Sequence, residues 1–96
     1  MLLTPAWEAV AKAQWEYEVE LELLAQLVLE ELAAHVDWAA RLRTRRTQGP
    51  DWELSRFRLV HVRAERVEVA VELERATQAL RVALNGVEDE VRRGRG

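Results

Sequence analysis

The fold is decided by the stretch 41-RLRTRRTQGPDWELSR-56, which holds the strongest turn signal of the chain. Proline disfavours helical geometry in the residue before it, so Gly49-Pro50 ends a helix that enters from the N-terminal side. Pro50 also suits the first position of a new helix, and Asp51 and Glu53 complement the positive end of its dipole. The stretch therefore predicts a chain that folds back on itself.

Apolar residues on both sides of this turn recur at spacings of three, four and seven, as on the faces of helices. The stripe before the turn consists of Trp7, Val10, Tyr17, Leu21, Leu24, Val28, Leu32, His35, Trp38 and Leu42. The stripe after it runs through Leu54, Phe57, Val60, Ala64, Val67 and Val71, and passes to Leu73, Ala76, Leu80, Ala83, Val87 and Val91.

These patterns predict an all-α protein, a long antiparallel two-helix hairpin in one domain over residues 1–96. Thr4-Pro5 is a helix start, and Asn85-Gly86 is a helix terminator because glycine readily takes the left-handed cap conformation. The predicted parts are a helix over about 5–46, a turn over about 47–51, a helix over about 52–85 and a short C-terminal segment, 86–96.

Segments 15–23 and 67–73 alternate apolar and mostly acidic residues, which is also the pattern of half-buried strands. We favour helix, because glutamate and alanine are good helix formers and no tight hairpin turn follows either run. Alternation then places apolar groups on two faces of each helix, which predicts a dimeric or higher helical bundle. The expected interface anchors are Trp7, Trp15, Tyr17, Val69 and Leu73.

The composition limits the classes of protein to which this chain can belong. A chain of 96 residues buries only part of the surface that its unfolded form exposes, so we expect its stability to depend on assembly. It has no cysteine and no apolar run of membrane-spanning length, which predicts a cytoplasmic protein without a membrane partner. Isoleucine is absent and asparagine occurs once, as is typical of a GC-rich genome and of a thermophile.

The charges are segregated along the chain. Residues 1–40 hold eight acids and one base, whereas residues 41–66 hold eight arginines and three acids, within a net charge of −3. Arginine suits bidentate contacts with phosphate, and Trp38 and Trp52 flank the turn, where they could stack on bases. The candidate anion-binding and nucleic-acid-binding residues are Arg41, Arg43, Arg45, Arg46, Arg56 and Arg58. The alternative is structural, since arginines compensate a helix dipole or bind the acidic end of a neighbouring copy.

Two Glu/His pairs are candidate metal ligands. Glu31 and His35 lie four apart, as do His61 and Glu65, so each pair shares a helix face. In the predicted hairpin, residues whose numbers sum to about 97 face each other, which puts Glu31 opposite about residue 66 and His35 opposite about residue 62. The four side chains form a ligand set suited to a divalent metal such as zinc, iron or manganese. The alternative is an ordinary solvated pair on each helix.

The segment 29-LEELAAHVDW-38 resembles the first helix of the encapsulated ferritins. The resemblance covers these residues together with chain length and hairpin layout. It implies a hairpin that assembles with other copies, and an iron-binding role for Glu31. Family members carry Glu-x-x-His on the second helix, whereas this chain has His61 and Glu65 in the reverse order and Val69 about where the histidine is expected.

No residue in the sequence is a clear candidate for a catalytic role. Ser55 and the two histidines lack the context of a catalytic triad, so an enzyme is not the favoured class. The favoured function is a non-enzymatic structural or adaptor subunit of a larger assembly, formed with its own copies or other proteins. The alternatives are a subunit of a nucleoprotein complex that binds phosphate through its arginines, and a ferritin-like metal-binding bundle.

Overall fold

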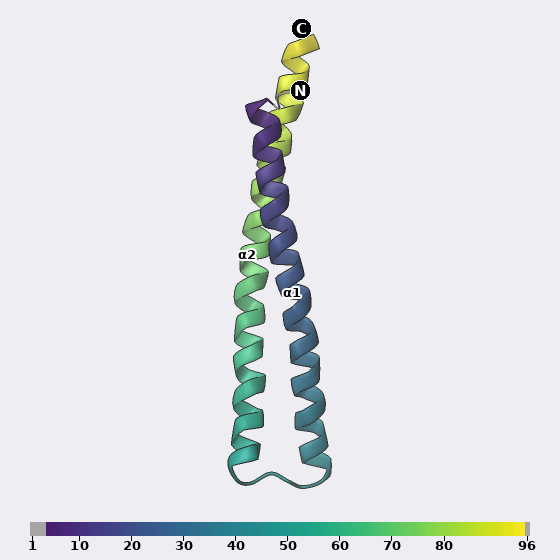
Figure 1. Cartoon of the computed structure of the whole chain (residues 1–96), viewed down its shortest axis with the longest axis vertical. Coiled ribbons are helices and arrows are strands. Elements are labelled where there is room, and N and C mark those ends of the chain that lie inside the picture. The colour runs from purple at the N-terminus through teal and green to yellow at the C-terminus, as the bar shows by residue number, and fades with distance from the viewer. Residues whose placement is uncertain (1–3, 96) are drawn as a thin grey trace. The chain divides into compact units, whose positions relative to one another are not determined.

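The protein consists of two long helices. In the computed structural model, which describes residues 4–95, α1 spans Pro5–Arg43 and α2 spans Pro50–Arg95, and residues 44–49 connect them (Figure 1). No strand occurs among these residues, so the preference for helix in segments 15–23 and 67–73 is confirmed, as is the all-α hairpin. Within the same range no helix is long and apolar enough to cross a membrane. Gly96, the end of the predicted C-terminal segment, lies outside the described residues.

The helices take part in two compact units. Unit 1 contains the described parts of Met1–Glu22 and Ala70–Gly96, and unit 2 is Leu23–Val69. In each unit a stretch of α1 lies antiparallel to a stretch of α2 (Figure 1). Unit 2 holds the connection between the helices and every residue of the predicted metal and anion sites.

The row of residues that packs each helix against the other follows a seven-residue repeat. Buried or half-buried residues alternate at spacings of three and four, which is the pattern of a coiled-coil seam. In α1 they are Val10, Ala13, Tyr17, Glu20, Leu24, Leu27, Glu31, Ala34, Trp38 and Arg41. In α2 they are Trp52, Ser55, Leu59, Val62, Arg66, Val69, Leu73, Ala76, Leu80, Ala83, Val87 and Glu90.

This seam is poor in large apolar side chains. Among the residues whose burial the structure describes, eight hydrophobic residues are buried, three of them alanines, and eighteen large hydrophobic residues are exposed. The predicted stripe over residues 54–71 is one of the exposed rows, since Phe57, Val60 and Val67 each expose more than half of their surface. The most hydrophobic face of α2 in unit 2 therefore points away from α1.

Both helices begin at the predicted signals. The Trp7 N–H donates to Thr4 Oγ1 at 3.4 Å, so Thr4 caps α1. The same hydroxyl donates to Glu90 Oε2 at 3.2 Å, which ties the start of α1 to α2 within unit 1. Helix α2 begins at Pro50, and Gly49 (φ 91°) precedes it in a conformation that favours glycine.

Helix α1 ends at Arg43, three residues before the predicted end. Arg45 adopts a left-handed conformation with φ of 55°. The Arg45 N–H then donates to the Leu42 carbonyl at 3.2 Å and the Arg46 N–H to the Arg41 carbonyl at 2.9 Å. These two bonds form a Schellman motif, which satisfies carbonyl groups that the helix leaves free at its end.

Helix α2 continues through Asn85-Gly86 to Arg95, so the predicted end at residue 85 is wrong. Gly86 does not adopt the positive φ that a glycine cap requires. Beyond it Val87 is buried and Glu90 is half-buried in unit 1. The packing of these residues outweighs the cost of glycine inside a helix, which is about 1 kcal/mol relative to alanine.

We expect Gly86→Ala to stabilise the protein by about 0.5–1 kcal/mol, because an added Cβ meets no atom within 4 Å and alanine loses less entropy in a helix. Thermal unfolding followed by circular dichroism measures this change. Gly94→Ala, close to the end of α2, is the matched control and should give a smaller gain. A loss of stability in Gly86→Ala would mean that the helix ends there.

Candidate functional site

The register predicted for the hairpin is confirmed in unit 2, but the partners differ from the predicted ones. Glu31 forms ion pairs with Arg66 and, at 3.4 Å from Oε1, with Arg63 Nε. Arg63 Nη2 also lies 2.5 Å from His35 Nε2. Arg66 Nε is buried and touches the carboxylate without hydrogen-bond geometry. Glu31 therefore neutralises arginines at the seam.

The second predicted Glu/His pair is separate from the first. His61 Nε2 lies 2.5 Å from Glu65 Oε1, and the His61 ring stacks on Phe57 with centroids 5.8 Å apart. Residues two apart on a helix point in nearly opposite directions, so His61 and Glu65 point away from Arg63 and its partners. No three His, Cys, Asp or Glu side chains between residues 4 and 95 form a group that could hold a metal ion. The structure thus does not bring Glu31 and His35 together with His61 and Glu65 within one chain.

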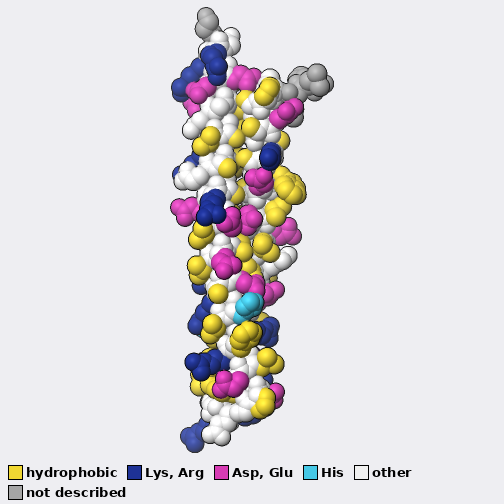
Figure 2. All heavy atoms as spheres, turned by 90° about the vertical axis from the view of Figure 1, so that its left-hand side faces the viewer, with side chains coloured by type: hydrophobic (Ala, Val, Ile, Leu, Met, Phe, Trp, Pro, Cys, Tyr) yellow, Lys and Arg dark blue, Asp and Glu magenta, His cyan; other side chains and the backbone are white. Residues whose placement is uncertain are grey.

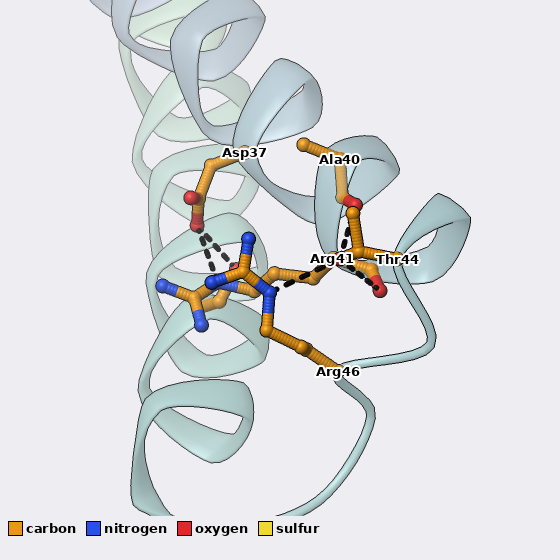
Figure 3. A network of polar contacts seen from close by, with 6 residues as sticks. Asp37, Ala40, Arg41, Thr44 and Arg46 are labelled. Atoms are coloured by element: carbon orange, nitrogen blue, oxygen red, sulfur yellow. Dashed lines mark hydrogen bonds and ion pairs between the residues drawn. The ribbon is translucent and has the colours of Figure 1, made fainter.

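A second polar cluster lies on the opposite side of unit 2, closer to the connection. Asp37 Oδ2 accepts hydrogen bonds from Ser55 Oγ at 2.7 Å and from Arg41 Nε at 3.2 Å (Figure 3). The Ser55 hydroxyl, then Arg41 and more weakly Arg58, hold the pKa of Asp37 below its ordinary value of 3.8. Ser55, which is buried, has a structural role here that its sequence context does not reveal.

Trp38 and Trp52 do not present free faces for bases. Their rings stack on each other with centroids 3.9 Å apart and an interplanar angle of 21°. Both belong to the seam and are half-buried, so the stack closes unit 2 next to the connection. The structure thus gives both residues a role in packing between the helices, and their stacking on bases stays a prediction.

The predicted anion-binding residues lie around the connection. Arg41, Arg45 and Arg46 line one open cavity of about 490 Å³, together with Thr47, Gln48 and Asp51. Arg41 also contacts Asp37, and the Arg46 Nε donates to Thr44 Oγ1 at 3.1 Å (Figure 3). Arg43, Arg56 and Arg58 are outside this cavity, and Arg58 lines a smaller one with Asp37 and Ser55.

Unit 2 exposes apolar side chains on both of its helix segments. The Arg63–His35 contact fixes which flanks of the two helices meet. Residues three, four or seven apart share a helix face, so Val28 and Leu32 lie on the flank of His35, and Val60 and Val67 on that of Arg63. These four exposed residues form the outer apolar face of unit 2, and Leu29, Val36 and Phe57 expose further apolar surface around the same helices. Figure 2 shows hydrophobic side chains at the surface between charged ones.

The five predicted interface anchors divide into two groups. Trp7 and Trp15 are exposed, as an interface role requires, with 47% and 65% of their surface accessible. Tyr17, Val69 and Leu73 are half-buried in the seam between α1 and α2. The outer apolar face of unit 2 is absent from that prediction, although Val60 and Val67 stand at helical spacing in the sequence.

Comparison of the chain with protein-family models, with curated proteins and with solved structures found no match.

We expect Glu31→Leu to destabilise the protein by about 1–3 kcal/mol, because the buried Arg66 Nε loses its carboxylate. Glu31→Leu/Arg66→Leu should recover most of this loss by making the seam apolar. Urea unfolding at one protein concentration measures both changes. Glu72→Leu, which breaks only an exposed pair with Arg75, should cost less than about 0.5 kcal/mol. A double variant less stable than the single one would contradict this account of the seam.

Ser55→Ala should raise the pKa of Asp37, because it removes the Ser55 hydrogen bond, which is the largest cause of the lowered pKa. A depressed carboxyl pKa stabilises the fold above the ordinary value of 3.8, and this contribution is lost as pH falls through the pKa of the folded state. The stability difference between the parent protein and the variant should therefore shrink in acid. NMR titration of the Asp37 carboxyl carbon and unfolding at pH values above and below 3.8 test this.

Thr77→Ala is the control, since the Thr77 hydroxyl donates to the Leu73 carbonyl and to no carboxylate. Its effect on stability should not depend on the ionisation of Asp37. An unchanged Asp37 titration in Ser55→Ala would refute the assignment.

Proposed function

We propose that this protein is a non-enzymatic structural subunit that assembles with other copies of itself through the outer apolar face of unit 2. The observation that carries the proposal is the distribution of apolar side chains. Leu32, Val60 and Val67 expose 55–60% of their surface, whereas much of the seam is alanine, glutamate or arginine. Exposed contiguous apolar surfaces of this kind mark sites of protein association.

The stability of the chain supports the same proposal. Long helices depend on tertiary packing of an apolar face, because helix propensity alone contributes little. A seam with eight buried hydrophobic residues, three of them alanines, supplies a small part of the burial available to a chain that is 49% hydrophobic. Pairing two outer apolar faces buries the larger side chains and gives each helix a second apolar neighbour, as in a four-helix bundle.

The charges favour a second copy of the chain as the partner that covers the outer apolar face. The segments of unit 1 hold ten acids and six bases, a net charge of −4, and unit 2 holds seven acids and eight bases, a net charge of +1. Segments of opposite net charge in one chain favour association of the chain with copies of itself.

We expect light scattering after size exclusion to give a mass of at least twice the 11.1 kDa of the chain, at low and at high salt, because burial of apolar area drives the association. Leu32→Glu should shift the protein towards the monomer, since it places a charge within the outer apolar face. Val82→Glu is the matched control, since Val82 is also exposed but belongs to unit 1. A monomeric parent protein, or equal dissociation by both substitutions, would sink the proposal.

A further inference from the structure

Most of the arginines around the connection have no carboxylate partner. Arg41, Arg63 and Arg66 form ion pairs with Asp37 and Glu31. No acidic side chain in the described part of the chain lies within 4.0 Å of the guanidinium groups of Arg43, Arg45, Arg46, Arg56 and Arg58. Unit 2 therefore carries positive charge that its own carboxylates do not neutralise.

Two of these arginines line one cavity together with Arg41. Arg41, Arg45 and Arg46 line the same cavity, where Asp51 is the one carboxylate among the lining residues and Thr47 and Gln48 add polar groups. Like charges in one cavity repel each other, and an anion that binds there removes the repulsion. The Asp37 carboxylate and the Thr44 hydroxyl hold Arg41 and Arg46 in place, so the cavity is partly preorganised (Figure 3).

The backbone at Arg45 supports a role for this side chain. Its φ of 55° belongs to the left-handed region, where glycine is the favoured residue at the end of a helix. Arginine is strained at this position relative to glycine. A backbone outlier that carries a charged side chain into a cavity of like charges is more typical of a binding site than of a helix cap alone.

We propose that this cavity binds a phosphate group of a nucleic-acid backbone. Guanidinium groups match phosphate oxygens in pairs, and hydroxyl and amide groups such as those of Thr47 and Gln48 also contact phosphates. Arg43, Arg56 and Arg58 extend the positive surface beyond the cavity on both helices, so a strand has further phosphate contacts next to the first. Because contacts with phosphate carry no sequence information directly, we expect this binding to be independent of base sequence.

Fluorescence anisotropy of a labelled DNA duplex, titrated with the full chain at about 50 mM and about 200 mM salt, tests the proposal. The affinity of the parent protein should fall by roughly a thousandfold between the two salt concentrations if about six phosphates are contacted. Arg45→Gln/Arg46→Gln should bind more weakly at low salt and should reduce this ratio by about tenfold, because about two contacts are lost. The control Arg81→Gln/Arg93→Gln removes the same charge from unit 1 and should leave binding unchanged.

Two further measurements keep the result independent of folding and of assembly. Arg45→Gly removes the charge and relaxes the backbone, so it should raise the thermal midpoint while weakening DNA binding. Light scattering of Arg45→Gln/Arg46→Gln should give the mass of the parent protein. No binding at low salt, equal losses in the variant and its control, or dissociation of the variant into monomers would overturn the proposal. The last result would assign the cavity to carboxylates of a second copy.

Discussion

The rest of this structure depends on the seam between α1 and α2, because small and charged side chains occupy many positions of its seven-residue repeat. Ala13, Ala34 and Ala76 occupy buried seam positions, and Glu31 and Arg66 occupy two more. Small residues let two helices approach closely but remove little apolar area from water. The ion pair fixes the register of the helices in unit 2, while its desolvation offsets much of its attraction. Such a seam specifies how the helices pair and contributes only modestly to stability.

The exposed apolar surface follows from this composition of the seam. In a hairpin with a strong seam, the leucine, valine and phenylalanine side chains occupy the seven-residue repeat, and the outside is polar. Here Leu29, Leu32 and Phe57 are outside, and the pairing of the two helices does not bury them. In the proposed assembly, exposed apolar side chains form the contact between copies, whereas Glu31 and Arg66 set the register of the helices in unit 2.

The sequence predicts the secondary structure and the register well, because both depend on local signals. Gly49-Pro50 sets the turn, and the turn alone places residue 66 opposite Glu31, as the ion pair with Arg66 confirms. The sequence predicts poorly which face of each helix packs against the other helix. A search for hydrophobic periodicity follows the largest side chains, and in residues 54–71 these side chains are on the outside. The end of α2 was missed for a similar reason. Asn85-Gly86 is a terminator by local preference, and only the packing of Val87 in unit 1 overrides it. The metal-site hypothesis used the correct register but not the rotation of each helix, which turns His61 and Glu65 away from Arg63.

The polar contacts near the connection link the seam to the cavity. Ser55 is buried in the seam and donates to Asp37, which holds the pKa of that carboxyl below its ordinary value. The ionised carboxylate accepts the Arg41 N–H and so holds one of the three arginines that line the cavity. A single buried hydroxyl therefore helps to orient a charged group at the surface. Because the Nε atom of Arg41 donates to Asp37, the proposed phosphate contact would use the other nitrogen atoms of this guanidinium group. In that proposal Arg41 takes part in the cavity without loss of its contact with Asp37.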